Sequence, residues 1–238
     1  MKFKHILIII FFSLSKNTFA QKSNPNMKNK VPNSVEIVDS HLDNFFTDKD
    51  DIVVFDEIES EIIHRDVFFI KANDERPFHI LLSCGMSALP MNIPNDINSS
   101  EFAEVMILLP KEWNLNYESF SDERNYWPVR VIKELMMLPH SEKTWLGFGH
   151  TFEFDDNNEF AEGVGFSSVM LVHSMELSED FATIKKNDNK YIEIYTLIPL
   201  YKEELEYKKQ NGVEALLEKF DEFGIEEIVK IGRKNVCK

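Results

Sequence analysis

Cysteine is almost absent from this sequence, and basic residues are outnumbered by acidic ones. The 238 residues include two cysteines, and 26 lysines and arginines stand against 41 aspartates and glutamates. Cys84 and Cys237 lie far apart, so neither has a neighbour at the spacing of a cysteine-ligated metal site. An exported protein could oxidise the two to a disulfide. We expect free thiols, because Cys84 lies in an apolar run and Cys237 is next to last.

The acidic balance restricts the partners that the protein can bind. Its formal net charge is −15, and a surface of that sign repels nucleic-acid phosphates. Binding to DNA or RNA is therefore not expected, whereas a basic protein is favoured as a partner. Solubility alone explains an acidic surface equally well. Hydrophobic residues make up 43% of the chain, which is enough for one core, and one domain is expected at this length.

Residues 1–20 have the pattern of a secretory signal peptide. Lys2 and Lys4 precede an apolar run over residues 6–14, and Thr18-Phe19-Ala20 supplies the small-x-small pattern of a cleavage site. The run is shorter than the roughly 20 apolar residues that span a bilayer. We therefore predict cleavage and no stable membrane span.

Cleavage before Gln21 would give an exported protein, either periplasmic or secreted. A start codon at Met27 and a cytoplasmic location remain the alternative. Residues 21–33 are polar, contain two prolines and predict a linker. Residues 34–238 then form the predicted domain.

Hydrophobic periodicity predicts strands in runs and helices at the start, middle and end of the domain, which is typical of an α+β fold. Helices are expected over residues 34–46, 126–138, 200–210 and 213–220, the second of them with Pro128 in its first turn. Strands are expected over residues 62–70, 78–84, 102–109, 144–154, 164–172 and 191–198.

Four residues are candidates for catalysis or metal binding. His140 and His150 are ten residues apart, which is neither the helical i, i+4 pair nor a short loop spacing of a metal site. His64 and Asp66 would share one face of a strand, and such a pair can orient a catalytic imidazole. A structural or surface pair is the more common role of two such residues. The glycine motifs lack the third glycine or the lysine of a nucleotide-binding loop. No cofactor and no metal are expected.

Several long motifs resemble the suppressor of fused family. They are "HRDV", "SCGMSALPMNIP", "EVMILLPKEW", "YWPVRVIKELMMLPHSEKTWLGFGHTF" and "LIPLYKEELEYKKQNGVEALLEKFDEFGI", in the family's order over residues 45–238. The closest resemblance is to single-domain bacterial members. It implies an α+β domain whose mixed sheet is flanked by helices, and a protein-binding role without catalysis. The second domain of animal members is expected to be missing, so their signalling role should not be carried over.

The resemblance also implies a binding region, because animal members place partner contacts in the part that corresponds to residues 145–151. The candidate protein-binding residues are Trp145, Gly147, Gly149, His150 and Thr151. A purely structural role for these residues is weighed equally.

Two functions from different classes follow. The first is a non-catalytic binding module, most concretely an immunity protein that masks a toxin. The second is a hydrolase or metalloenzyme that uses His64, Asp66, His140 or His150.

Overall fold

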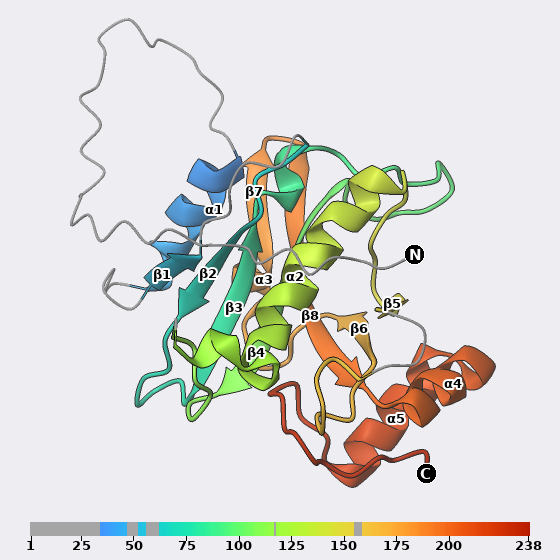
Figure 1. The fold of residues 1–238 in the computed structure, drawn as a ribbon. Helices are drawn as coiled ribbons and strands as arrows, with labels where there is room; N and C mark the ends of the chain where they lie inside the picture. Colours follow the sequence, from blue (N-terminus) through green and yellow to red (C-terminus); the bar gives the residue numbers. More distant parts are fainter. Residues whose placement is uncertain (1–33, 47–51, 56–61, 117, 155–158) are drawn as a thin grey trace, which may run out of the picture. The chain divides into compact units, whose positions relative to one another are not determined.

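A mixed β-sheet forms the centre of the fold in the computed structural model (Figure 1). The structure describes residues 34–46, 52–55, 62–116, 118–154 and 159–238, and the side chains of all of them except 52–55. The predicted signal peptide and linker lie outside the described residues. Within the unit Asn33–Lys238, the strands are β1 (Ile52–Phe55), β2 (Asp66–Ile70), β3 (Phe78–Cys84), β4 (Phe102–Pro110), β5 (Thr151–Glu153), β6 (Ser168–Val172), β7 (Thr183–Asn187) and β8 (Lys190–Leu200).

The strand order is β1-β2-β3-β4-β8-β6-β5, and β7 pairs with β8 beside this path. The β4–β8 pair is parallel, and every other pair in the sheet is antiparallel. The long strand β8 pairs with β7 through its first half and with β6 through its second half. The predicted α+β class with a mixed sheet is confirmed.

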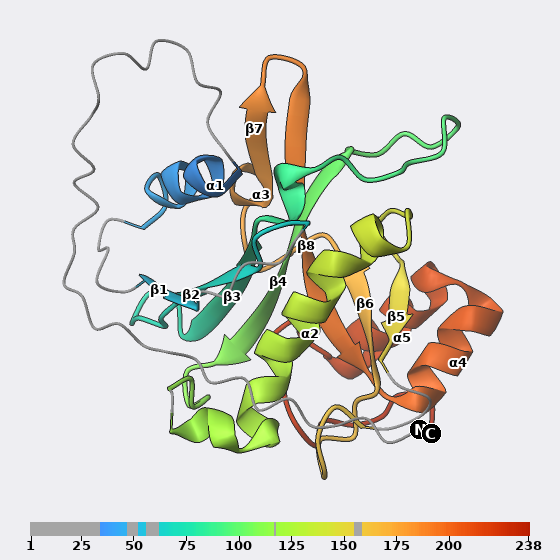
Figure 2. The same cartoon turned by 45° about the horizontal axis from the view of Figure 1, so that its top comes forward.

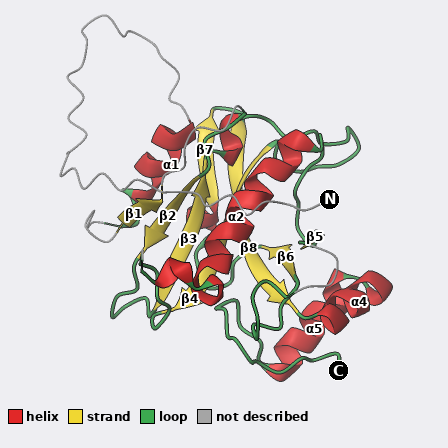
Figure 3. Ribbon diagram, in the orientation of Figure 1, coloured by secondary structure: helices red, strands yellow, loops and turns green. Residues whose placement is uncertain are grey.

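Helices cover both faces of the sheet (Figures 2 and 3). They are α1 (Ser34–Leu42), α2 (Glu123–Ser141), α3 (Glu179–Ala182), α4 (Lys202–Asn211) and α5 (Val213–Phe223). Helix α2 packs on one face through Trp127, Ile132 and Leu135. On the other face, α1 packs against β3 and β7, and α3 packs against β7 and β8. Helices α4 and α5 cover β6 and the end of β8. In the described residues, no helix is both long and apolar enough to cross a bilayer.

Burial on both faces explains why the central strands are continuous apolar runs. Every residue of β3 is buried, and β4 is buried from Phe102 to Leu109. Alternating polar residues would place unsatisfied groups under a helix on one face. The second half of the sequence obeys the same rule, since all five residues of β6 are buried.

Several predicted elements differ from the structure at their boundaries, among them α2 and β2. Helix α2 begins at Glu123, three residues before the predicted start, because the Asp122 carboxylate accepts a hydrogen bond from the Arg124 N–H and caps the helix. Pro128 consequently lies inside the helix rather than in its first turn. The strand predicted over residues 62–70 begins only at Asp66.

Candidate functional site

The chain from Gly147 to His150 forms a tight turn that leads into β5. The His150 N–H donates to the Gly147 carbonyl at 3.1 Å, and Gly149 has a φ of 76°. A four-residue turn with positive φ at its third position is a type II turn, which favours glycine there. The Gly149 N–H donates to the Leu171 carbonyl at 2.8 Å, and the Leu171 N–H donates to the His150 carbonyl at 2.9 Å. Gly149 and His150 thus both face Leu171 on the neighbouring strand. This arrangement, with two residues opposite one, is a G1 β-bulge.

The two glycines of this turn answer different requirements. A Cβ atom on Gly147 would lie 2.3 Å from Cζ3 of Trp145, because the indole ring covers this residue. Gly149 needs its positive φ, and a Cβ atom there would lie 3.2 Å from Val213 at the start of α5. Glycine at both positions therefore lets the turn fold back beneath Trp145 and against α5.

The strand predicted over residues 144–154 is wrong over its first seven residues. The structure forms β5 only from Thr151 to Glu153. The physical reason is the turn itself, which reverses the chain at Phe148 and Gly149. The alternating pattern of residues 144–154 reflects a turn and a short edge strand.

The predicted binding residues are brought together around this turn. The Trp145 and His150 rings lie 4.3 Å apart between centroids, nearly edge to face. Burial lowers the pKa of His150, although its hydrogen bond to the Trp145 backbone opposes this effect, and the charge of Lys208 lowers it further. The lowered pKa favours the neutral form of the His150 ring in this cluster. Thr151 follows as the first residue of β5.

Phe148 at the tip of the turn was not singled out from the sequence. It is 42% exposed and stacks on His173, with 5.2 Å between ring centroids and 6° between ring planes. His173 in turn lies 5.4 Å from the Tyr195 ring of β8. The sequence signal for Phe148 was an aromatic residue between two glycines. An exposed aromatic side chain in a rigid turn is suited to contact a partner.

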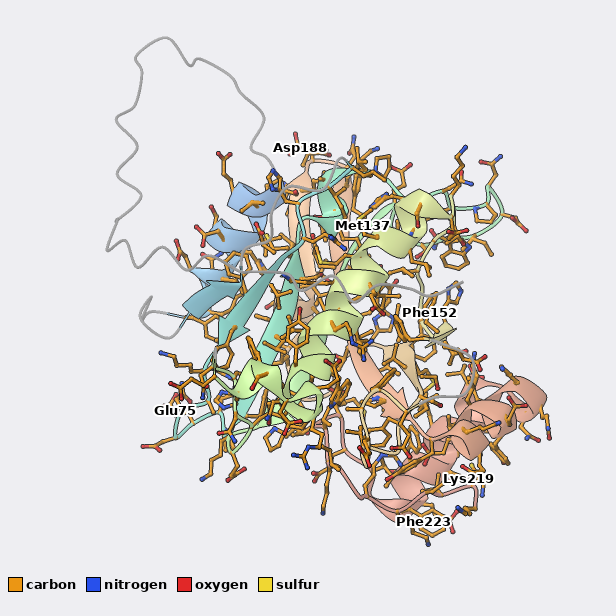
Figure 4. The ribbon with its side chains drawn as sticks, viewed as in Figure 1. Glu75, Met137, Phe152, Asp188, Lys219 and Phe223 are labelled. Atoms are coloured by element: carbon orange, nitrogen blue, oxygen red, sulfur yellow. The ribbon has the colours of Figure 1, made fainter. Side chains whose placement is uncertain are left out.

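Within the described residues, no strand pairs with the outer side of β5, which is an open sheet edge. Among the described strands β5 ends the sheet order, and it pairs with β6 from Thr151↔Met170 to Glu153↔Ser168. His150 accepts from Leu171, so by alternation Phe152 directs its backbone groups to β6. The N–H and C=O groups of Thr151 and Glu153 then point away from the sheet. Phe152, labelled in Figure 4, marks this end of the sheet.

Helix α4 lies beside β5 on one face. The Lys209 ammonium forms an ion pair with Glu153 at 2.7 Å. Lys208, its neighbour in the last turn of α4, is half-buried. Burial lowers the pKa of Lys208, and the positive charge of Lys209 lowers it further.

Three of the four candidate catalytic residues lie around the loop that follows β3. His64 is exposed and lies before β2, so it does not share a strand face with Asp66 as predicted. A Cβ atom on Gly85 in this loop would lie 2.2 Å from the His64 carbonyl oxygen. Asp66 is the register partner of Cys84. His140 on α2 reaches the same loop through Nε2, which lies 3.0 Å from the Met86 carbonyl.

This arrangement does not converge on a reaction centre. Burial lowers the pKa of His140, against a raising effect of its bond to Met86, and the ring holds the loop in place through that bond. His150 belongs to the separate cluster around Trp145. In the part of the chain that the structure describes, no three histidine, cysteine, aspartate or glutamate side chains are grouped to hold a metal ion.

A buried carboxylate organises the same loop and was missed from the sequence. Glu104 of β4 has no exposed surface. Its Oε1 accepts from the Ser87 hydroxyl at 2.7 Å, the Ser87 N–H at 3.0 Å and the Gly85 N–H at 3.1 Å, while Oε2 accepts from the Ser83 hydroxyl. Burial raises the pKa of Glu104, whereas these hydrogen bonds lower it. The available signal was one acidic residue inside the apolar run of β4.

The two cysteines lie in different hydrophobic clusters. Cys84 packs with Leu42, Leu82 and Met106 between the sheet and α1. Cys237 contacts the cluster formed by α4, α5 and the end of β8. Both are free thiols in the structure.

The comparisons with known proteins agree with this fold. The family model described as Suppressor of fused protein (SUFU) matches residues 62–234, well over half of the chain. The chain belongs to the suppressor of fused family.

Similar proteins include members of this family with solved structures. A suppressor of fused homolog from Neisseria gonorrhoeae FA 1090 superposes with a TM-score of 0.61 at 19% identity, over 85% of this chain and 96% of that chain. The crystal structure of the Sufu–Fu complex gives a TM-score of 0.61 at 11% identity, over 87% of this chain and 93% of that chain. Drosophila Suppressor of Fused superposes with a TM-score of 0.55 at 11% identity, over 84% of this chain and 50% of that chain.

One curated relative is similar in sequence. Uncharacterized protein UU111 of Ureaplasma parvum serovar 3 is 28% identical over 180 residues, which cover 74% of this chain and 81% of that protein. The structural neighbours share the suppressor of fused fold at identities too low to carry residue roles.

Proposed function

We propose that this chain is a non-catalytic protein-binding module, and that a partner segment adds a strand to the outer edge of β5. The observation that carries the proposal is the open edge at Thr151 and Glu153, beside the exposed ring of Phe148. Unpaired backbone groups at an edge are a template for an incoming strand. The family includes a structural neighbour solved as a Sufu–Fu complex, which supports a role in binding proteins.

A proline substitution tests the edge directly. Thr151→Pro removes an N–H that points away from β6, so the internal ladder stays intact and one donor to the partner is lost. Phe152→Pro removes an N–H that β6 uses, and it should destabilise the sheet instead. We expect Thr151→Pro to keep a native circular dichroism spectrum and to lose partner capture. Thr151→Arg, which places a bulky charge at the edge, should also weaken capture.

Photo-crosslinking in the native host can identify the partner. A photoreactive residue at Phe148 should capture a protein that the same residue at Met175, which is 87% exposed, does not capture. The crosslink should disappear when Thr151→Pro is added. Identical capture from both positions, or capture that survives Thr151→Pro, would contradict the proposal.

The most concrete form of this role is an immunity protein that masks a toxin. Its net charge of −15 would speed the encounter with a basic target. Cells that make a toxin encoded beside this gene should grow only when the chain is also made, and Thr151→Pro should abolish the rescue. Rescue by the Thr151→Pro variant would argue against masking through β5.

We further propose that the protein is exported after cleavage before Gln21, on the basis of the basic start and the apolar run over residues 6–14. N-terminal sequencing of the protein from its native host should begin at Gln21. A product that begins at Met1 or Met27 would contradict export.

A further inference from the structure

The two faces of β5 offer different chemistry to an added strand. Thr151 faces Met170 across the ladder, and Met170 packs under α4 and α5. Thr151 and Glu153 therefore lie on the α4 face of the sheet. Phe152 faces Val169, which packs toward α2. Side chains of an added strand would alternate between the same two faces.

The α4 face carries an ammonium group that no carboxylate of the described residues neutralises. Lys209 is neutralised by Glu153 at 2.7 Å and Glu206 at 3.3 Å. Among the described residues, no carboxylate forms an ion pair with Lys208, although its side chain is half-buried. Lys208 precedes Lys209 in the last turn of α4, and the Lys209 ammonium reaches Glu153 of β5.

The surroundings of Lys208 disfavour its charged form. Burial and the nearby charge of Lys209 both lower its pKa. A half-buried ammonium beside a second cation gains from a carboxylate that can approach it. No such group comes from the described part of the chain, and an incoming strand on β5 could supply one.

The α2 face of the same edge is apolar. Trp145 and Phe152 both pack against the core cluster under α2, and the His150 ring lies between them, 4.3 Å from Trp145 and 6.4 Å from Phe152 between centroids. An apolar side chain on this face of an added strand would extend that cluster.

We infer that the partner segment which pairs with β5 carries a carboxylate on its α4 side, aimed at Lys208, and an apolar side chain on its α2 side, against Trp145 and Phe152. This inference rests on the proposed strand addition. The partner segment that contacts β5 would therefore carry a negative charge, whereas the net charge of −15 favours a basic partner. A partner can be basic over most of its surface and still present an acidic residue at this point.

Synthetic peptides test the charge preference without the natural partner. We would titrate the full chain with a capped pentapeptide that alternates valine and glutamate, and with matched peptides in which glutamine or lysine replaces glutamate. Binding is read from the chemical shifts of the Thr151 and Glu153 backbone amides. The glutamate peptide should bind roughly fivefold more tightly than the glutamine peptide, and the lysine peptide more weakly than either. Added salt should reduce the difference.

A matched pair of variants separates Lys208 from net charge. Lys208→Met keeps the aliphatic stem and should abolish the preference for glutamate over glutamine. Lys202→Met, at the opposite end of α4, changes the net charge equally and should keep the preference. If the peptides shift the edge amides without preferring glutamate, or if Lys208→Met keeps that preference, the inference is overturned while strand addition stands. If no peptide shifts these amides, strand addition at β5 is itself overturned.

Discussion

The indole ring of Trp145 lies over Gly147 so closely that no larger residue fits between them. A Cβ atom on Gly147 would lie 2.3 Å from Cζ3 and 3.1 Å from Cε3 of the ring. The Trp145 ring also contacts the His150 ring. The turn, the ring and the start of β5 therefore hold one another in place, and the open edge is presented by a rigid support.

Gly147→Ala tests this support. The added methyl group must displace Trp145 or the turn, so we expect a loss of about 1–3 kcal/mol in the free energy of unfolding, as in other overpacked sites. Urea unfolding followed by tryptophan fluorescence measures it. Gly163→Ala is the matched control, because a Cβ atom there meets nothing within 4 Å and only the positive φ is strained. A smaller loss for Gly147→Ala than for Gly163→Ala would contradict the packing.

Glu104 should be the costliest acidic residue to remove. Glu104→Ala leaves two backbone N–H groups and two buried hydroxyls without their acceptor, and we expect a loss of at least about 3 kcal/mol in the free energy of unfolding. Glu104→Gln should cost less, because the amide oxygen can replace Oε1 and the amide nitrogen can face Ser83. The ranking is measured by urea unfolding of both variants.

Glu101→Ala provides the comparison for Glu104. Glu101 forms an exposed ion pair with Lys190 at 2.6 Å, and such pairs contribute at most about 1 kcal/mol. Similar losses for Glu101→Ala and Glu104→Ala would mean that the hydrogen bonds around Glu104 do not organise the loop after β3.

Acidification should destabilise the protein partly through His140. Burial lowers the pKa of this half-buried ring in the folded state below its ordinary value of 6.5. The unfolded chain then binds the proton more readily, so the contribution of His140 is fully present above pH 6.5 and is lost as the pH falls through the folded-state pKa.

His140→Gln isolates this contribution, since glutamine keeps a hydrogen-bond donor for the Met86 carbonyl and does not titrate. Between pH 7.5 and 5.5 the variant should lose less stability than the wild type. The difference is expected to be under about 1 kcal/mol, because solvent screens a half-exposed group. Equal losses for the two proteins, measured by urea unfolding at both pH values, would rule out His140 as a contributor.

The sequence pattern predicts the central strands well because a strand that is buried on both faces consists of a continuous run of mostly apolar residues. The predicted bounds of β3 match the structure from Phe78 to Cys84. Within the helix predicted over residues 213–220, Leu216 and Phe220 are the two buried residues of α5. By contrast β7 was not predicted, since Ile184 is its one buried residue and its strand form depends on pairing with β8.

The candidate site shows where local pattern is insufficient. Gly147 and Gly149 stand out in the sequence as candidate site residues, but the bulge exists only because Leu171, distant in sequence, pairs with both Gly149 and His150. The place of Lys208 likewise depends on how α4 packs beside β5. His64 and Asp66 were expected to share a strand face, and the structure starts the strand too late for that.

The cysteines give a final prediction, in which reactivity follows from burial. Thiol reagents attack the thiolate, so a raised pKa and a covered sulfur both slow the reaction. Burial raises the pKa of Cys84 well above its usual range, and the nearby charge of Glu104 adds to the effect. Burial also raises the pKa of Cys237, which remains partly exposed.

The native protein should therefore react with a thiol reagent slowly at Cys237 and more slowly still at Cys84. The unreduced protein should reveal two thiols once it is unfolded in denaturant, because the two residues pack in separate clusters. Cys237→Ser should remove the faster phase and leave one thiol in the unfolded protein. A count of zero from unreduced monomeric protein would mean that the two cysteines are joined and that the C-terminal segment packs differently from the structure.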